Sequence, residues 1–246
     1  MKVVAINSSP KMNKGNTALI LNPFLEGMEA AGAEIELYYT KELVINPCLG
    51  CVTCWFKTPG KCVRKDDMTS LFPKIKKADT LVFATPVYVD GVSGPMKNLM
   101  DRLIPLGNPS LEIRNGHTRH PFDPKSDQKR VILVSSCGFW ELDTFDPLIS
   151  HMKGLTLHFG GQFAGALLRP HAEFLKPMMA KGIPLDDIFE GAKEAGRQLV
   201  KDGVMANSTL QTISRELIDQ KTYVERINRA YEQAMESLNN YVDKGR

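Results

Sequence analysis

Four of the chain's five cysteines lie within one short segment, PCLGCVTCWFKTPGKC, which covers residues 47–62 and is called the cysteine segment below. Cys48, Cys51, Cys54 and Cys62 have the spacing C-x2-C-x2-C-x7-C. Thiols this close together can form disulfides, bind zinc, bind an iron–sulfur cluster or simply pack. Zinc sites usually use two separated cysteine pairs, whereas three closely spaced thiolates can wrap one face of a cubane cluster. The spacing therefore favours iron–sulfur.

The composition and the first residues indicate a cytoplasmic protein. MKVVAINSSP contains only a short apolar run, so we expect neither a secretory signal nor a membrane span. In a reducing compartment a tight, odd-numbered cysteine set binds metal or acts in catalysis more often than it forms disulfides. The 31 Lys and Arg residues against 28 Asp and Glu residues give a net charge of +3. Without a clustered basic face, this charge does not predict nucleic-acid binding.

The hydrophobic pattern alternates between strands and helices through most of the chain. Short apolar runs predict strands, and apolar residues at helical spacing predict the helices between them, although Pro23 and Pro73 should bend or delay two of these helices. Such alternation indicates βαβ units and a doubly wound parallel sheet. The predicted strands cover residues 3–6, 34–39, 80–86, 130–138 and 160–170.

Three polar loops follow predicted strands: NSSPKMNKGNT, TPVYVDGVSG and SSCGFWE. Ligands of doubly wound sheets bind beyond the carboxyl ends of the strands, so these loops are the candidate binding site. The first loop offers hydroxyl and amide donors at the start of a helix, where a phosphate is favoured. It lacks the Lys-Ser/Thr ending of a triphosphate loop and the glycine spacing of a dinucleotide loop. A mononucleotide therefore fits best, and a simple strand-to-helix turn is the alternative.

Two segments are additional to what a minimal doubly wound fold requires. Residues 106–129 are polar, turn-rich and too long for an ordinary connection, so we interpret them as a functional or interface loop. His117 and His120, with Asp123 close by, could bind a metal there, but we expect a solvated histidine pair. Near the end of the chain, apolar residues recur at alternating spacings of three and four; this stripe either packs on its own domain or forms a dimer arm. Its members are Val224, Ile227, Tyr231, Ala234, Leu238 and Tyr241.

The three loops together resemble those of the flavodoxin-like NAD(P)H-dependent FMN reductases, over about residues 1–170. In the first loop, Ser9-Pro10-Lys11 stands where Ser-Pro-Arg is common in the family, and Gly15-Asn16-Thr17 ends it. Lys11 in place of Arg leaves a point charge without a two-pronged donor, so phosphate binding should be modestly weaker. The second loop is similar to the family's second flavin loop through Pro86, Tyr88, Gly91, Lys97, Asp101 and Arg102.

The resemblance implies a fold and a set of cofactor contacts. It implies a five-stranded sheet of order 2-1-3-4-5 in a domain at 1–205, which contains the cysteine segment and the long loop, with a helical extension at 206–246. The residues implied to bind FMN are Ser9, Lys11, Gly15, Asn16 and Thr17 at the phosphate, and Pro86, Val87, Tyr88, Val89, Asp90, Ser136, Cys137 and Gly138 around the ring. Tyr88 could instead be a core aromatic. No dedicated catalytic acid is required, since hydride transfer to a flavin needs none.

The cysteine segment resembles the compact motif of iron–sulfur flavoproteins, which implies a 4Fe-4S cluster bound by Cys48, Cys51, Cys54 and Cys62. The stretch GKCVRKDDM also resembles FMN reductases that carry related cysteines without a cluster. Free or redox-active thiols and structural zinc therefore stay open. We expect a homodimeric or larger reductase that passes electrons from NAD(P)H or a reduced carrier to a small-molecule or protein acceptor. The alternatives are an FMN electron carrier without NAD(P)H turnover and a non-enzymatic module with structural zinc.

Overall fold

The computed structural model describes residues 1–121, 129–159 and 161–244. The chain divides into two compact units, Met1–Arg215 and Glu216–Arg246, and each is described by itself. Within the described residues, no helix is both long enough and apolar enough to cross a membrane.

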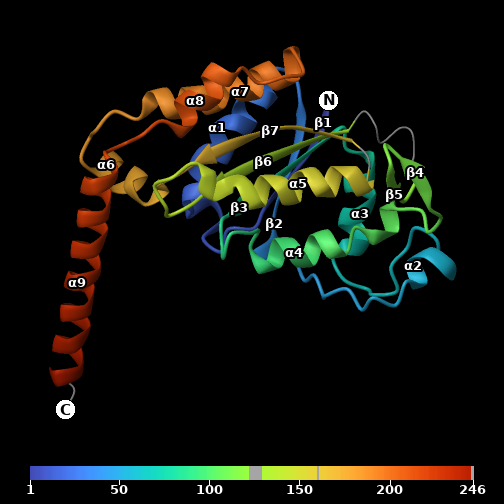
Figure 1. Cartoon of the computed structure of the whole chain (residues 1–246), viewed down its shortest axis with the longest axis horizontal. Helices are drawn as coiled ribbons and strands as arrows, with labels where there is room; N and C mark the ends of the chain where they lie inside the picture. Colours follow the sequence, from blue (N-terminus) through green and yellow to red (C-terminus); the bar gives the residue numbers. More distant parts are fainter. Residues whose placement is uncertain (122–128, 160, 245–246) are drawn as a thin grey trace. The chain divides into compact units, whose positions relative to one another are not determined.

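The first unit is built on a five-stranded sheet of order β2-β1-β3-β6-β7 in which all neighbouring strands are parallel (Figure 1). The strands are β1 (Lys2–Asn7), β2 (Glu34–Tyr39), β3 (Thr80–Pro86), β6 (Arg130–Ser136) and β7 (Gln162–Arg169). Because β6 and β7 are the fourth and fifth strands of this sheet along the chain, the predicted flavodoxin-like order 2-1-3-4-5 is confirmed.

Helices cover both faces of the sheet. On one face α1 (Asn16–Ala30) packs closely against α7 (Asp186–Lys201), which in turn packs against α8 (Asn207–Ser214) (Figure 1). On the other face lie α3 (Met68–Lys77), α4 (Gly94–Asp101) and α5 (Asp146–Phe159). A short helix, α6 (Leu175–Ala180), follows the last strand. Pro23 lies inside α1 and Pro73 inside α3, so neither helix is delayed until after its proline.

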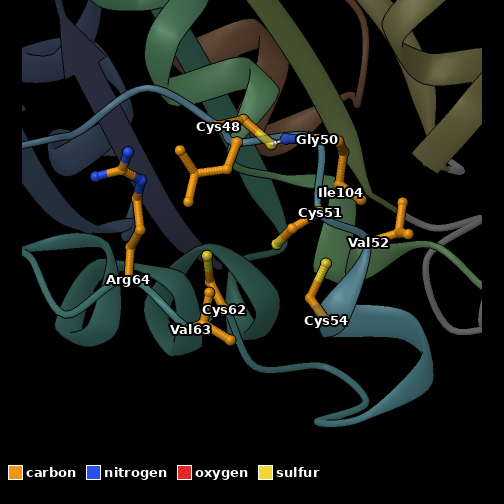
Figure 2. Close-up of a pocket in the computed structure, with 10 residues that line it drawn as sticks. Cys48, Gly50, Cys51, Val52, Cys54, Cys62, Val63, Arg64 and Ile104 are labelled. Atoms are coloured by element: carbon orange, nitrogen blue, oxygen red, sulfur yellow. Dashed lines mark hydrogen bonds between the residues drawn. The ribbon is translucent and has the colours of Figure 1, made fainter.

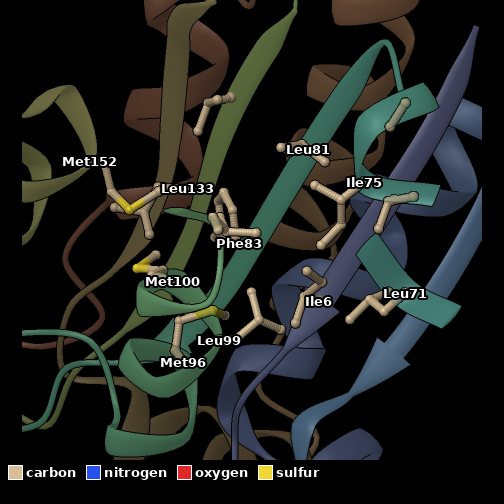
Figure 3. Close-up of a cluster of buried hydrophobic side chains, with 14 of the residues drawn as sticks. Ile6, Leu71, Ile75, Leu81, Phe83, Met96, Leu99, Met100, Leu133 and Met152 are labelled. Atoms are coloured by element: carbon tan, nitrogen blue, oxygen red, sulfur yellow. The ribbon is translucent and has the colours of Figure 1, made fainter. Parts of the chain in front are cut away.

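The core on the α3–α4–α5 face is made of branched and unbranched apolar side chains that fill the space between strands and helices (Figure 3). Ile6, Phe83 and Leu133 project from three adjacent strands and are fully buried. Strands buried on both faces are nearly continuous in hydrophobic residues, which is why β3 could be predicted to the residue. The helices contribute Leu71, Ile75, Met96, Leu99, Met100 and Met152.

A small hairpin lies within the segment that the sequence suggested was a long loop. β4 (Glu112–Arg114) pairs antiparallel with β5 (His117–Arg119), and the two are joined by Asn115 and Gly116, both with positive φ. Asn-Gly is the preferred pair for a type I′ hairpin turn, so this sequence signal was present. Asp123 lies outside the described residues.

The second unit consists mainly of one long helix, α9 (Gln220–Lys244). Tyr223 near its start is buried, whereas Val224, Tyr231 and Met235 are exposed. These exposed side chains include two members of the predicted apolar stripe. The side chains of Leu238 and Tyr241 lie outside the described part of the helix.

Candidate functional site

The first candidate loop connects β1 to α1 and is closed by contacts around Ser9. The side-chain oxygen of Asn7 accepts a hydrogen bond of 2.9 Å from the Ser9 amide. A Cβ at Gly15 would lie 2.5 Å from the Ser9 hydroxyl oxygen, so a larger residue here would force the Ser9 side chain to move. The φ of Gly15 itself is ordinary. α1 begins at Asn16 and no side chain caps it. Its first amides therefore meet the requirements of an anion site.

The first and third loops are joined by a buried hydrogen bond. The hydroxyl of Thr17, in the first turn of α1, lies 2.8 Å from the hydroxyl of Ser136, the last residue of β6. Thr17 and Ser136 are almost completely buried. The hydrogen bond fixes the start of α1 against the carboxyl end of β6.

The second loop follows β3 and contacts both of the others. The amide of Val87 donates to the carbonyl oxygen of Ser136 over 3.0 Å. The hydroxyl of Ser93, at the start of α4, lies 2.7 Å from the hydroxyl of Ser8 in the first loop. The three predicted loops therefore meet at one rim, beyond the carboxyl ends of β1, β3 and β6, which we call the strand-end rim.

A tight turn projects from the second loop. Tyr88 and Gly91 exchange backbone hydrogen bonds of 3.0 and 3.1 Å, and Val89 and Asp90 between them have φ values of 49° and 57°. Positive φ at both central residues defines a type I′ turn, which is unfavourable for a β-branched valine. The turn exposes Val89 completely and Tyr88 to 49%, so Tyr88 is not a core aromatic. Pro86 and Val87 are half-buried.

The third loop contains a buried cysteine and an exposed glycine, Cys137 and Gly138. The Cys137 amide donates to the carbonyl oxygen of Arg169 over 3.1 Å, and its thiol donates to that of Phe139 over 3.4 Å. Burial raises the pKa of the Cys137 thiol to about 11. This thiol is therefore neutral at physiological pH and is separate in character from the four clustered cysteines.

Two buried residues behind the third loop were not found from the sequence. The Arg169 guanidinium donates to the carbonyl oxygens of Ile213 and Arg215, both at 2.7 Å, and lies 3.0 Å from Nε2 of His171. The His171 ring stacks on Trp140, with 6.1 Å between centroids. Burial, reinforced by the charge of Arg169, lowers the pKa of His171 to about 4. Nothing in the local sequence around His171 reveals that this side chain is enclosed.

The four clustered cysteines line a single pocket with apolar neighbours that include Val52 and Ile104 (Figure 2). They are free thiols. Burial, together with the charge of Cys62, raises the pKa of the Cys54 thiol. The Cys51 thiol is exposed, and a hydrogen bond with Thr53 lowers its pKa. The amide of Gly50 donates to the Cys48 sulfur over 3.4 Å.

The spacing of these thiols can be compared with what zinc and a cluster require. Among the described residues, no three His, Cys, Asp or Glu side chains are placed to bind one metal ion. Zinc binds thiolates at about 2.3 Å, which draws four sulfurs around a single point. A cubane cluster binds each thiolate at a different iron corner, so its four sulfurs lie farther apart. The four thiols line one pocket, and zinc, a cluster and free thiols stay open as alternatives.

A buried ion pair anchors the chain next to the cysteine segment. Arg102 follows α4 and donates to both carboxylate oxygens of Asp66, at 2.6 and 3.0 Å. The Trp55 indole within the segment donates to the carbonyl oxygen of Ile104 over 2.9 Å. Lys97 and Asp101 form an exposed pair on α4. The resemblance matched three of these residues to the second flavin loop: Lys97, Asp101 and Arg102. In the structure they make contacts within α4 or with Asp66, next to the cysteine segment.

The strand-end rim and the cysteine segment lie at opposite ends of α4. Ser93 precedes the helix and contacts Ser8 of the first loop, whereas Arg102 follows the helix and contacts Asp66. An eight-residue helix is about 12 Å long. Contacts from the two candidate sites thus lie at opposite ends of the same helix.

One histidine of the hairpin region, His120, contacts both the hairpin region and the cysteine segment. Nδ1 of His120 lies 3.0 Å from the carbonyl oxygen of Ser110, and its ring packs on Trp55 with 4.9 Å between centroids. His120 is partly buried and joins the hairpin region to the cysteine segment. His117 lies in β5 and is exposed.

Comparisons with known proteins agree with this arrangement. The family model of the NADPH-dependent FMN reductases matches residues 1–127. An iron-sulfur flavoprotein of Methanocaldococcus jannaschii is 41% identical over 115 residues, which are 47% of this chain and 58% of that protein. One from Archaeoglobus fulgidus is 38% identical over 117 residues, 47% of this chain and 52% of that protein. The chain spans about half the length of these curated relatives.

Solved structures share the fold at low sequence identity. An FMN-dependent NADH-azoreductase from Bacillus anthracis, in complex with FMN, superposes with a TM-score of 0.61 at 16% identity, covering 81% of this chain and 99% of that one. An NAD(P)H:quinone oxidoreductase from Methanothermobacter marburgensis has a TM-score of 0.56 at 17% identity, covering 81% of this chain and 96% of the other.

Proposed function

Because the chain belongs to the NADPH-dependent FMN reductase family, we propose that it binds FMN at the strand-end rim and passes electrons from NAD(P)H, or another reduced carrier, to a small-molecule or protein acceptor. One observation carries the proposal: the buried hydrogen bond between Thr17 and Ser136 that joins the start of α1 to the end of β6. It places an uncapped helix start beside two neighbouring loops, at the position where doubly wound sheets bind nucleotides.

The residues of the rim divide between the two ends of the cofactor. We assign the phosphate to Ser9, Lys11, Gly15, Asn16 and Thr17, where α1 supplies amides and Lys11 supplies a positive charge. We assign the ring to Pro86, Val87, Tyr88, Val89, Asp90, Ser136, Cys137 and Gly138. The exposed faces of Tyr88 and Val89 would be covered by a flat ring, which accounts for apolar side chains in an otherwise unfavourable turn.

The protein's contribution is to bind, orient and shield. When bound, FMN supplies the redox chemistry, since it accepts a hydride as two electrons and can release them singly. The backbone amides of the second and third loops would set the polarity around the ring, and Pro86 and Val87 would exclude water from one side of it. The neutral Cys137 thiol adds no charge there.

Replacing Lys11 tests the phosphate assignment. In FMN titrations of the cofactor-free protein, Lys11→Met should weaken binding by about tenfold, because a charge-assisted hydrogen bond contributes about 1.5 kcal/mol. Lys11→Arg should bind at least as tightly as the wild type, since it restores a two-pronged donor. Lys74→Met removes an exposed lysine paired with Glu36 and should leave FMN affinity unchanged. Equal affinity of all four proteins would remove Lys11 from the site.

Turnover separates a reductase from an electron carrier. We expect the FMN-loaded protein to oxidise NADPH or NADH steadily when a quinone or a ferric chelate is present. Photoreduced protein that passes electrons to these acceptors, but never oxidises either nicotinamide, would instead support the carrier alternative. Failure of the protein to retain FMN would contradict both.

For the cysteine segment we propose a 4Fe-4S cluster that receives electrons from the flavin. Cys48, Cys51, Cys54 and Cys62 would be its ligands, because they line one apolar pocket. The printed names of the relatives, iron-sulfur flavoproteins, support the assignment.

Metal analysis tests the cluster. Protein purified without oxygen should contain about four irons and four acid-labile sulfides per chain, as a 4Fe-4S cluster requires. Cys62→Ser should lose most of this iron, while Cys137→Ser should keep it. Zinc in place of iron would favour the structural-zinc alternative, and neither metal would favour free thiols.

We also propose that the protein is a homodimer in which α9 contacts a second copy. The support is the exposed apolar stripe that includes Val224 and Tyr231. Sedimentation equilibrium at micromolar concentration should give twice the mass of one chain, and Tyr231→Lys should shift the equilibrium toward monomer. A wild-type monomer under these conditions would contradict the proposal.

A further inference from the structure

The ion pair between Arg102 and Asp66 is unusual because neither side chain reaches solvent. Each is 1% exposed. Their geometry is the two-pronged arrangement that arginine forms with carboxylates. Although burial alone would raise it, hydrogen bonds from Arg102 and Asn46 lower the pKa of Asp66 to about 2. Both groups therefore remain charged in the interior.

The ion pair links the residues that precede and follow the cysteine segment. Asp66 also accepts hydrogen bonds from the Asn46 amide at 3.0 Å and its side-chain nitrogen at 3.2 Å. Arg102 donates to the Asn46 carbonyl oxygen over 2.7 Å. Asn46 precedes the segment and Asp66 follows it, so one guanidinium holds both ends of the loop that carries the four thiols. We call these three residues the clamp.

Arg102 keeps its charge in this buried position, and its Nε donor is not used by the clamp. Although burial alone would lower it, the hydrogen bond with Asp66 and the charge of Cys62 raise the pKa of Arg102. The Nε atom of Arg102 is buried and has no hydrogen-bond partner among the described residues. A buried donor of this kind is costly unless a further acceptor is present.

We propose that Arg102 is a positioning residue for the cysteine segment: it holds the two ends of the segment together through Asn46 and Asp66. Because Arg102 directly follows α4, and α4 begins at the second flavin loop, the same helix connects both candidate sites. The role in cluster binding rests on the proposed function, whereas the role in holding the segment does not.

Hydrogen exchange of the cluster-free protein tests the positioning role without any cofactor. Arg102→Lys keeps the charge but loses the two-pronged contact, so amides of the cysteine segment should exchange about tenfold faster while those of β3 and β6 exchange as in the wild type. The matched control is Arg197→Lys, which makes the same change at a partly exposed pair with Glu194. It should leave the segment unchanged. Unchanged exchange in Arg102→Lys, or an equal increase throughout the sheet, would overturn the proposal.

Iron uptake tests the consequence for the cluster. After anaerobic reconstitution, Arg102→Lys should hold less than half the iron of the wild type, and Arg197→Lys should match the wild type. Arg102→Gln combined with Asp66→Asn removes both buried charges, which avoids leaving one of them uncompensated. This double variant should also hold less iron than the wild type, because it loses the contacts of the clamp. Wild-type iron content in the Arg102 variants would overturn the proposal. If the wild type itself takes up no iron, the cluster assignment fails, and hydrogen exchange still decides the positioning role.

Discussion

At the scale of single residues, buried polar side chains form a defined set of contacts behind the third loop. His171 lies between Arg169 and Trp140, behind the third loop of the strand-end rim. The guanidinium of Arg169 needs an acceptor at Nε2, which the neutral imidazole provides. Protonation of His171 would remove that acceptor and place two positive charges side by side.

The protein should therefore lose stability when His171 is protonated. Its pKa of about 4 in the folded state lies below the ordinary value of 6.5, so the unfolded chain binds the proton more tightly. The free energy of unfolding should rise with pH between about 4 and 6.5, by roughly 3 kcal/mol in total, and the penalty should be complete below this window. Urea unfolding across this range measures it.

His171→Gln serves as the control for this dependence, because it keeps a side-chain acceptor and cannot titrate. The difference between wild type and variant should change with pH only between about 4 and 6.5. Asp66 contributes in a lower range, since its stabilisation is lost as pH falls from about 4 to its folded pKa of about 2. A difference independent of pH would show that His171 is not the titrating group.

At the scale of elements, α1 and α7 approach so closely that each needs a glycine at the contact. A Cβ at Gly27 would lie 1.8 Å from the carbonyl oxygen of Lys193, and one at Gly196 would lie 2.1 Å from that of Phe24. These neighbours are backbone atoms, which cannot move aside as a flexible side chain can. The helix pair supports α1, whose first turn carries the proposed phosphate site.

Gly196→Ala should consequently destabilise the protein by about 3 kcal/mol, as overpacking of a rigid contact does. The control is Gly154→Ala in α5, where the new Cβ meets no atom within 4 Å. That substitution should stabilise by about 0.5 to 1 kcal/mol, because alanine loses less backbone entropy in a helix. Chemical denaturation of both variants gives the comparison, and equal effects would show that the two helices can separate without cost.

At the scale of the whole molecule, the two compact units differ in how they are stabilised. The first unit buries a continuous core on a parallel sheet. Along α9, by contrast, residues 224–236 are exposed or only partly buried. A helix gains most of its stability from packing an apolar face, so an unpacked α9 would be marginal.

Amides of residues 224–236 should accordingly exchange much faster than those of β1, β3 and β6 at low protein concentration. If α9 contacts a second copy as proposed, its exchange should slow as the concentration rises. Exchange in β6, whose residues after Arg130 are buried, serves as the internal reference. Slow exchange in α9 at every concentration would contradict this view of the second unit.

The alternation of strands and helices, the three loops at the strand ends and the clustering of four thiols could be predicted from local sequence pattern, whereas the order of the strands was implied by the resemblance to the FMN reductases. The strands at 34–39 and 80–86 were predicted to the residue, since hydrophobic periodicity directly reports which faces are buried. The hairpin at β4 and β5 was missed although its Asn-Gly turn was visible. The contribution of individual rim residues to FMN binding stays a prediction.

Only the tertiary structure decided which distant side chains meet. Thr17 and Ser136 are 119 positions apart, and Arg102 and Asp66 are 36 apart, so no local pattern links them. The family resemblance placed Arg102 with the second flavin loop. In the folded chain its side chain instead pairs with Asp66, next to the cysteine segment. Local sequence determines which segments become strands and helices, but burial, hydrogen-bond partners and pKa shifts arise only when the folded chain brings separate elements together and excludes water between them.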